Sequence, residues 1–317
     1  MLTLTELFLK QGFSVIVSSD KSNKIFRLFD ICSCVLKNQK KVDILLIDTF
    51  STLNFYYAFV ISQLARLLAI KYIPILHGGN LPTRLDNSKF MSSLIFKNSY
   101  KNISPSIYLQ QEFKTRGYTS EYIPNSIPIK EYDFKERQHL SLKLLWVRAF
   151  DKIYNPLLAI KVLHLLKKKF ENIQLCMVGP DKDGSLNEVQ SLVHKLELTT
   201  NITITGVLKK EEWHQLSESY DIFINTTAID NMPVSVLEAM ALGLPIISTN
   251  VGGIPYLIKD KENGILVPAN DENEMATAII NLLNNPEEAN RLSLSARLFA
   301  EQFDIEIIKE QWFNLLK

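Results

Sequence analysis

The chain has 317 residues, and its 35 Lys and Arg residues nearly balance its 34 Asp and Glu residues, giving a formal net charge of +1 at pH 7. This balance argues against a nucleic-acid-binding protein, and the length suits two domains that each bury a core. The 3 cysteines form neither a disulfide framework nor a CxxC motif, and the 5 histidines show no metal-ligand spacing, so no metal is expected.

Helices and strands are predicted to alternate along the N-terminal third of the chain. Apolar periodicity places helices at residues 2–10 and 25–38 and strands at residues 13–18, 42–47 and 72–76. Residues 53–70 are apolar over a length that could span a membrane, but Gln63 and Arg66 favour a helix packed on a sheet.

The start of the chain departs from the usual opening of a doubly wound domain, a central strand followed by a glycine-containing loop. No such segment precedes residue 13. In a sheet of order 3-2-1-4-5 the absent strand is the middle one, so two interior strands would keep unpaired N–H and C=O groups. We hypothesise a truncated or mis-started reading frame, which upstream in-frame codons for an apolar strand and glycines would support. A signal-peptide pattern is also absent, so the cytoplasm is the expected location.

The predicted strand at residues 72–76 leads into His77, Gly78, Gly79 and Asn80. Glycines at the carboxyl end of a strand let the backbone approach a ligand, and an imidazole can hydrogen-bond a sugar hydroxyl or stabilise developing charge. A lone histidine is more often structural, so the residues by themselves favour a structural role.

The first domain is predicted to end near residues 122–125 (YIPN), and residues 127–138 have the composition of a charged linker. Residues 92–101 (SSLIFKNSYK) are predicted to form a helix with a partly basic face. Its few lysines are not enough to predict a membrane-binding surface.

The second domain opens with a predicted strand at residues 142–147 that ends at Arg148, with Lys152 four residues later. At the carboxyl end of a strand, Arg suits phosphate by its planar fork and Lys as a point charge, although isolated cations there are more often surface charges. The next predicted strand, at residues 173–179, leads into Gly-Pro-Asp-Lys-Asp-Gly. This turn is not the GxGxxG fingerprint of a dinucleotide site.

Residues 220–253 are the most informative stretch of the sequence. They predict a strand at 222–225, a polar loop to Pro233, a helix from Pro233 to residue 242, and a strand at 244–248. This is a β-loop-α-β unit with a right-handed crossover, and ligands of open α/β sheets bind at the carboxyl end of such a strand. Further helices are predicted at residues 272–284, 287–302 and 307–316.

Asp230 in the loop and Glu238 in the helix are separated by seven residues. The free N–H groups at a helix start attract phosphate, and a carboxylate one to two turns further can accept two hydrogen bonds from a ribose diol. An isolated acid pair is more often a helix cap and a buried, paired carboxylate. The arrangement nevertheless suits a phosphorylated sugar.

Residues 230–258 (DNMPVSVLEAMALGLPIISTNVGGIPYLI) resemble the donor-site signature of glycosyltransferase family 4. That signature has an acid, seven residues, a glutamate, AMA-x-G-x-P and a later GG-x-P. The resemblance covers nearly the whole chain and implies the GT-B fold, two Rossmann-like doubly wound parallel-sheet domains facing a cleft. It implies an acceptor-side domain at residues 1–127, a nucleotide-sugar domain at 128–302, and a final helix at 303–317 that packs back on the first domain.

The resemblance also implies a role for each matched residue. Glu238 would bind the ribose, Asp230 would contact donor-sugar hydroxyls, and Arg148 would hold the diphosphate together with Lys152. Other residues implied in donor binding are Asn231, the amides of Val234 and Ser235, Gly206 and Val207 beside the base, and Gly252 and Gly253 beside the sugar. His77 would lie under the donor sugar, with Gly78, Gly79 and Asn80 on the acceptor side. Pro233 stands where a glycine is common, which leaves phosphate binding to Val234 and Ser235.

The implied reaction is transfer of a hexosyl unit from a nucleotide diphosphate sugar to an acceptor hydroxyl, with retention at the anomeric carbon. The acceptor would be a sugar or glycolipid in cell-surface polysaccharide or glycolipid synthesis. UDP is commoner than GDP in the family and is expected first, and no metal or other cofactor is implied. The resemblance also implies peripheral contact with the inner membrane surface.

Three alternatives stay open at this point. A non-catalytic nucleotide-sugar-binding protein would keep the second-domain site without turnover. An NAD-linked oxidoreductase shares the Rossmann architecture, but the glycine fingerprint and the ribose acid about 20 residues later are missing. A sugar-nucleotide epimerase would need no acceptor. No pattern in the sequence identifies the acceptor, decides between UDP and GDP, or gives the oligomeric state.

Overall fold

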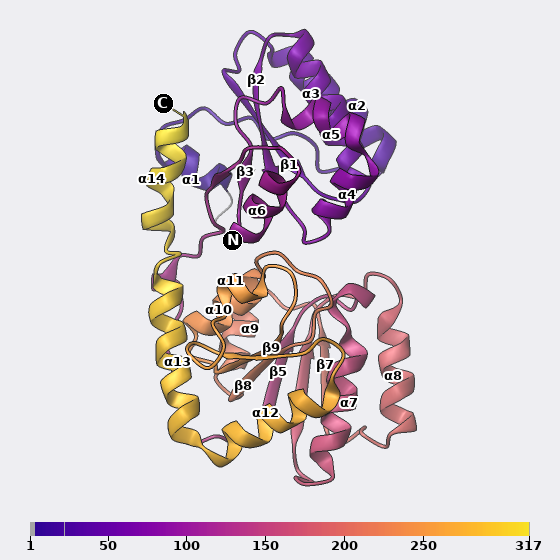
Figure 1. The fold of residues 1–317 in the computed structure, drawn as a ribbon, viewed down its shortest axis with the longest axis vertical. Helices are drawn as coiled ribbons and strands as arrows, with labels where there is room; N and C mark the ends of the chain where they lie inside the picture. The colour runs from indigo at the N-terminus through magenta and orange to yellow at the C-terminus, as the bar shows by residue number, and fades with distance from the viewer. Residues whose placement is uncertain (1–3, 22, 317) are drawn as a thin grey trace. The chain divides into compact units, whose positions relative to one another are not determined.

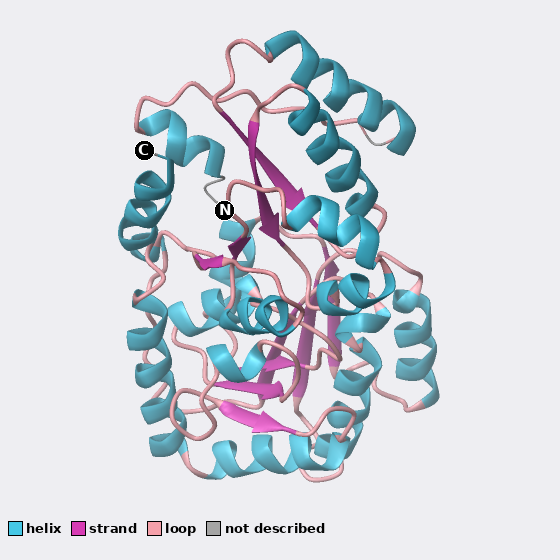
Figure 2. Cartoon of the chain, turned by 45° about the horizontal axis from the view of Figure 1, so that its top comes forward, coloured by secondary structure: helices cyan, strands magenta, loops and turns pink. Residues whose placement is uncertain are grey.

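The computed structural model describes residues 4–21 and 23–316. The chain divides into two compact units, one holding the described residues up to Ile127 and from Ile305 onward, the other Pro128–Asp304. Each unit is built on a sheet in which all the described strands are parallel, with helices packed on its faces (Figures 1 and 2). The predicted fold class, two α/β units with Rossmann-like parallel sheets, is confirmed.

The first unit has a sheet whose described strands follow chain order, β1-β2-β3-β4. The strands are β1 (Ile44–Thr49), β2 (Lys71–Leu76), β3 (Ile103–Ser104) and β4 (Glu121–Tyr122). The helices are α1 (Leu4–Lys10), α2 (Lys24–Asn38), α3 (Asn54–Leu67), α4 (Leu81–Asn87), α5 (Lys89–Phe96), α6 (Ile107–Thr115) and α14 (Ile305–Leu316). Side chains alternate along β2, so Ile73 and Ile75 pack with α1 and α14, whereas Tyr72 packs with α2 and α3.

Two predictions for this unit are wrong. Residues 13–18 form no strand, and the gap expected in the middle of the sheet does not exist, because β1 pairs directly with β2 over its full length. A strand is stable only when its N–H and C=O groups find partners in a neighbouring strand. Within the described residues, 13–18 have no such neighbour, and Ile16 and Val17 stay exposed.

Several helices differ from the prediction. The helix predicted at residues 92–101 is α5, which begins at Lys89 and ends at Phe96. Residues 53–70 contain α3 (Asn54–Leu67), a 14-residue helix packed on the sheet. No helix in the described part of the chain is long and apolar enough to cross a membrane. Helices α4 and α6 were not predicted.

The second unit contains β5 (Lys143–Val147), β6 (Gln174–Val178), β7 (Ile202–Gly206), β8 (Ile222–Asn225), β9 (Ile246–Thr249) and β10 (Ile265–Val267). Its helices are α7 (Pro156–Lys167), α8 (Ser185–Lys195), α9 (Lys210–Ser217), α10 (Val234–Ala241), α11 (Ile254–Leu257), α12 (Glu272–Asn284) and α13 (Pro286–Glu301). Two short 3-10 helices, η1 (Ile129–Glu131) and η2 (Lys152–Tyr154), precede β5 and α7. The predicted bounds of β8 and α12 are confirmed, whereas α8, α9 and α11 were not predicted.

The strand order of this sheet reverses beside its first strand. The order is β10-β9-β8-β5-β6-β7, which is 3-2-1-4-5-6 when read from β7 and numbered from β5. The connection from β5 leads one way along the sheet to β6 and β7, and β8 then lies on the other side of β5. Open α/β sheets bind ligands at such a reversal, outside the carboxyl ends of the two strands.

The core of the second unit fixes that edge in place. Alternate residues of the strands pack with α7, α8 and α12 on one face, and α10 packs with α13 (Figure 1). Arg137, only 2% exposed, donates hydrogen bonds to the main-chain carbonyls of Ser217, Tyr220, Leu242 and Gly243. These carbonyls lie at the carboxyl ends of α9 and α10, so a single side chain ties both helices to the segment that precedes β5.

Candidate functional site

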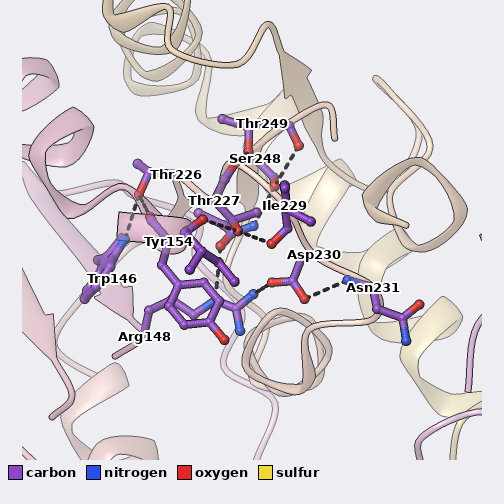
Figure 3. Close-up of polar contacts among 12 residues, drawn as sticks. Trp146, Arg148, Tyr154, Thr226, Thr227, Ile229, Asp230, Asn231, Ser248 and Thr249 are labelled. Carbon is purple, nitrogen blue, oxygen red and sulfur yellow. Dashed lines mark hydrogen bonds and ion pairs between the residues drawn. The ribbon is translucent and has the colours of Figure 1, made fainter. Parts of the chain in front are cut away.

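The structure brings Arg148 and Asp230 together at the strand-order reversal. Arg148 follows β5, Asp230 lies in the loop after β8, and the Nη2 group of Arg148 forms an ion pair with Oδ2 of Asp230 (Figure 3). The Nε group of Arg148 also lies 3.4 Å from Oδ1 of Asn225, the last residue of β8. Its Nη1 group makes no hydrogen bond within the described part of the chain, so one side of the planar fork is left for a ligand.

The Tyr154 ring packs against the guanidinium group of Arg148. The Cζ atom of Arg148 lies 4.6 Å from the centre of the Tyr154 ring, a cation–π distance (Figure 3). Burial lowers the pKa of Arg148 to about 10, which still leaves the side chain charged at neutral pH. Arg148 is therefore a buried, oriented cation whose direction is set by an aromatic ring, an amide and a carboxylate.

The loop after β8 is anchored to its surroundings by threonines. Thr226 accepts a hydrogen bond from Nε1 of Trp146 at 2.9 Å and donates to the carbonyl of Tyr154 at 2.8 Å. Thr249 donates to the carbonyl of Thr227 at 2.6 Å. These contacts connect β5, the loop after β8 and β9, so the backbone that carries Asp230 is held on several sides (Figure 3).

Gly252 and Gly253 let a second loop approach this one closely. A Cβ atom on Gly253 would lie 1.8 Å from the carbonyl oxygen of Asn231, and one on Gly252 would lie 2.3 Å from that of Asp230. The amide of Gly253 donates to the Asp230 carbonyl at 3.0 Å. The two glycines were expected to make room for the donor sugar, and the structure gives them a further role in packing the Asp230 loop.

Helix α10 starts one residue later than predicted. Pro233 has an extended backbone with ψ of 114° and is the cap residue, so the helix begins at Val234. The first intrahelical bonds run from Val236 and Leu237 to the Pro233 carbonyl. No backbone hydrogen bond from the amides of Val234 or Ser235 occurs among the described residues, and the buried hydroxyl of Ser235 has no partner there. These groups and the helix dipole can hold an anion.

Glu238 lies in the middle of α10 with 9% exposure. The hydroxyl of Tyr132 donates a hydrogen bond of 2.7 Å to its Oε1 atom. Burial raises the pKa of Glu238, and the Tyr132 hydrogen bond and the charge of Lys210 oppose that rise. The site thus contains a second buried acid, held by a tyrosine from the segment before β5.

Other predicted donor-binding residues lie elsewhere on the unit. The Nζ atom of Lys152 lies 3.3 Å from Oε1 of Glu188, and the side chain is 70% exposed, so the structure does not bring it to Arg148. Gly206, at the end of β7, has φ of +73°, a conformation that favours glycine. The Val207 side chain that follows is exposed.

His77 follows β2 in the first unit. Its Nε2 atom lies 2.9 Å from Oδ1 of Asp48, and its ring stacks on Phe50 with centroids 4.8 Å apart. Gly78 has φ of +86°, and Asn80 caps α4 without a side-chain hydrogen bond. A groove of about 480 Å³ in the same unit lies at the amino ends of β3 and β4, between residues such as Tyr100 and Glu121. It therefore lies at the amino ends of the strands, whereas His77 follows the carboxyl end of β2.

Sequence reasoning missed several residues that the structure places at the site. Tyr132 bonds Glu238, Tyr154 and Asn225 contact Arg148, and Lys210 and His214 pack against the Tyr132 ring. Asn225 could have been found as the last residue of a strand at the ligand edge. The others have no motif: Tyr154 follows Arg148 closely in the chain but belongs to no recognisable pattern, and Tyr132 lies far from Glu238 in the sequence. Within the described residues, no group of three or more His, Cys, Asp or Glu side chains could hold a metal ion.

Comparison with known proteins gives a consistent result. The sequence model of the family described as "Glycosyl transferases group 1" matches residues 129–299, more than half of the chain. An uncharacterized glycosyltransferase from Haemophilus influenzae is 29% identical over 211 residues, which are 65% of this chain and 57% of that protein. The amylovoran biosynthesis glycosyltransferase AmsK from Erwinia amylovora is 25% identical over 282 residues, 83% of this chain and 69% of AmsK.

The fold is that of a solved Anabaena protein, HepE, whose crystal structure is in complex with UDP and glucose. The two share 17% identity with a TM-score of 0.81, over 99% of this chain and 89% of that one. This likeness covers both units and places the chain in the GT-B fold class.

Proposed function

The chain belongs to the glycosyl transferases group 1 family, and from that premise we propose that it is a retaining glycosyltransferase of family 4. It would move a hexosyl unit from a nucleotide diphosphate sugar, UDP ahead of GDP, to an acceptor hydroxyl. The observation that carries the proposal is the ion pair of Arg148 with Asp230 at the reversal of strand order, in the loop that leads into α10. The UDP bound to the Anabaena structure supports UDP as the nucleotide.

In this proposal the second unit binds the donor. The free Nη1 side of Arg148 and the amides of Val234 and Ser235 hold the diphosphate, and Glu238 accepts hydrogen bonds from the ribose. Asp230 contacts hydroxyls of the donor sugar, as does His77. No cofactor enters the proposed reaction.

The same groups would accelerate the reaction by electrostatics. The bond between the anomeric carbon and the diphosphate oxygen breaks, and negative charge grows on that oxygen. Buried, oriented cations and amides stabilise such charge more than water does, because they need no reorganisation. The departing phosphate oxygen takes the proton of the acceptor hydroxyl, whose oxygen bonds the anomeric carbon on the same face. That sequence gives retention.

The test is donor binding followed by turnover. UDP and GDP are titrated into the purified chain by calorimetry, and UDP-glucose is then offered with sugar and glycolipid acceptors. We expect micromolar UDP binding that is lost in Glu238→Ala and kept in Glu188→Ala, the matched exposed carboxylate. A folded protein that binds neither nucleotide would overturn the proposal. Binding without transfer or hydrolysis would favour the alternative, a non-catalytic nucleotide-sugar-binding protein.

We also propose that the protein works in the cytoplasm with peripheral contact to the inner membrane surface, in cell-surface polysaccharide or glycolipid synthesis. Helix α2 supports the membrane contact, because Ile25, Phe26 and Phe29 are 65–70% exposed on a helix that also carries Lys24 and Arg27. Vesicles with an anionic lipid should bind the chain, and Phe26→Ser with Phe29→Ser should release it. Equal binding by the double variant would exclude α2 as the contact.

A further inference from the structure

Tyr132 has one direct contact with the donor site, and it is with the acid assigned to the ribose. Its hydroxyl donates to Oε1 of Glu238 at 2.7 Å, and no other hydrogen bond from the described residues reaches that carboxylate. We propose that Tyr132 is a positioning residue for the donor: it fixes the orientation of the Glu238 carboxylate and leaves Oε2 for the ribose hydroxyls. This inference rests on the proposed role of Glu238.

The position of Tyr132 is itself determined by α10. The Nη1 group of Arg297 donates to the carbonyl of Tyr132 at 2.9 Å and to the carbonyl of Ala241, the last residue of α10, at 2.6 Å. The Tyr132 main chain is thereby tied to the end of the helix whose middle carries Glu238. With the side chain bonded to Glu238 as well, Tyr132 is held to α10 at two points, as positioning requires.

The ring of Tyr132 is also confined. The Nζ atom of Lys210 lies 4.6 Å from the ring centre, and the His214 ring lies 4.6 Å away between centroids. The residue is 2% exposed, so the ring has little room to rotate. A hydroxyl on a ring confined in this way loses little freedom when it donates, which makes its hydrogen bond to a charged group effective.

The charged groups around Glu238 determine its response to pH. The charge of Lys210 on α9 acts on Glu238, and Lys210 also pairs with Glu131 at 3.7 Å. Arg297 on α13 bonds the Tyr132 carbonyl and pairs with Glu301. His214 does not add a titration near neutral pH, because burial and then Lys210 lower its pKa to about 4. Among the described residues, Tyr132 is thus the hydrogen-bond donor that opposes the rise in the pKa of Glu238 caused by burial.

Tyr132→Phe removes the hydroxyl that donates to Glu238 and tests the proposal directly. The pKa of Glu238 should rise, because its hydrogen-bond donor is lost while its burial remains. UDP affinity at about pH 7 should fall by about 10-fold, the size of one hydrogen bond to a charged group. The loss of affinity on acidification, measured by calorimetry between about pH 5 and pH 8, should begin at a higher pH than in the parent protein.

Tyr72→Phe is the matched control. Tyr72 is also 2% exposed, and its hydroxyl donates to the Ile95 carbonyl at 2.6 Å in the first unit. This variant loses a buried hydroxyl of the same kind, so its thermal stability should fall while its UDP affinity and pH profile stay at the parent values. Glu238→Gln should weaken binding and remove the pH dependence, and adding Tyr132→Phe to it should cause no further loss of affinity.

The outcomes distinguish the proposed role of Glu238 from the inference about Tyr132. If Glu238→Gln binds UDP as the parent does, the proposed role of Glu238 fails. If Glu238→Gln is weakened but folded Tyr132→Phe keeps the parent affinity and pH profile, the inference about Tyr132 alone is overturned, and a lower Tm would then mark a structural role. Should Tyr132→Phe not fold, fluorotyrosine at position 132 keeps the ring shape and is a stronger donor. Its loss of affinity must then begin at a lower pH, and an unchanged profile would again overturn the inference.

Discussion

The two sheets place their candidate residues in different ways. In the unit Pro128–Asp304 the strand order reverses between β5 and β8, and Arg148 and Asp230 follow those two strands with side chains only 12% and 14% exposed. In the other unit the described strands follow chain order without a reversal, and His77 and Asp48 pair with 26% and 69% exposure. Topology and burial therefore preorganise the first pair, whereas the second pair is more exposed, with the His77 ring held by Asp48 and Phe50. We expect the first pair to supply the larger part of binding and charge stabilisation.

The largest expected effect is that of Arg148→Ala. It removes the buried cation and leaves Asp230 without its partner, so kcat for sugar transfer should fall by about 100- to 1000-fold. Arg116→Ala removes a paired arginine of the other unit, bound to Asp86 and Glu112, and should leave transfer unchanged. Steady-state rates of UDP release measure both. An Arg148→Ala enzyme with more than a tenth of parent activity would remove the distinction between the two regions.

His77→Ala should have a smaller effect of a different kind. If His77 contacts only the sugar, kcat should fall by about 10- to 100-fold, the size of one or two hydrogen bonds made in the transition state. The calorimetric Kd for UDP should not change. Asp48→Asn keeps a hydrogen-bonding partner for His77 and should lose less activity. A large loss of UDP affinity in His77→Ala would contradict this division of roles.

The glycine loops of the two units should differ in their tolerance of a methyl group. In Gly253→Ala the new Cβ would collide with the Asn231 carbonyl, so the variant should lose about 3 kcal/mol of unfolding free energy. Gly78→Ala meets only Ser51 Oγ at 3.8 Å and carries only the cost of a positive φ, about 1 kcal/mol. Scanning calorimetry compares the variants. Equal losses would mean that the Asp230 loop is no more tightly packed than the His77 loop.

The smallest effect concerns stability and pH. The pKa of Glu238 is raised by burial, so the folded protein binds this proton more tightly than the unfolded chain does. Stability is then greatest when Glu238 is protonated and falls as pH rises from its unfolded pKa through its folded pKa. At about pH 8, Glu238→Gln should have a Tm about 2 to 4 °C above the parent, and the difference should close towards about pH 4. The exposed Glu188→Gln should show no such trend, and a Tm gain that persists at low pH would rule out this explanation.

Much of the fold could be predicted where one pattern dominates. The continuous apolar runs of β8 and β9, and the proline and glycine on either side of α10, predict this β-loop-α-β segment directly. Helix α12 has a clear helical period. Residues 13–18 were misjudged because apolar alternation indicates a strand only if a neighbour is present to complete its hydrogen bonds. Helices α8 and α9 were missed because their polar residues outnumber their apolar ones, so the core-facing stripe is narrow.

The candidate site was predictable only where its residues follow strands. Arg148 and Asp230 are both near carboxyl ends of strands, and parallel strands bring those ends to one edge. Tyr132 reaches Glu238 across 106 positions from a segment without periodicity, so only the folded chain shows the contact. Lys152 was implied by the family resemblance alone, and its place in the sequence does not fix the direction of a long, exposed side chain.

Arg137 links the assembly of the second unit to two helix ends far along the chain. Besides the nearby Lys135 carbonyl, its acceptor carbonyls lie 80 to 106 positions along the chain, at the ends of two different helices. The guanidinium group can leave water favourably only when both helix ends are in place, because a buried cation without acceptors is strongly unfavourable. Partly assembled forms in which residues 128–137 are docked before both helix ends are in place are therefore disfavoured. This unit should refold in one slow, cooperative step governed by long-range contacts.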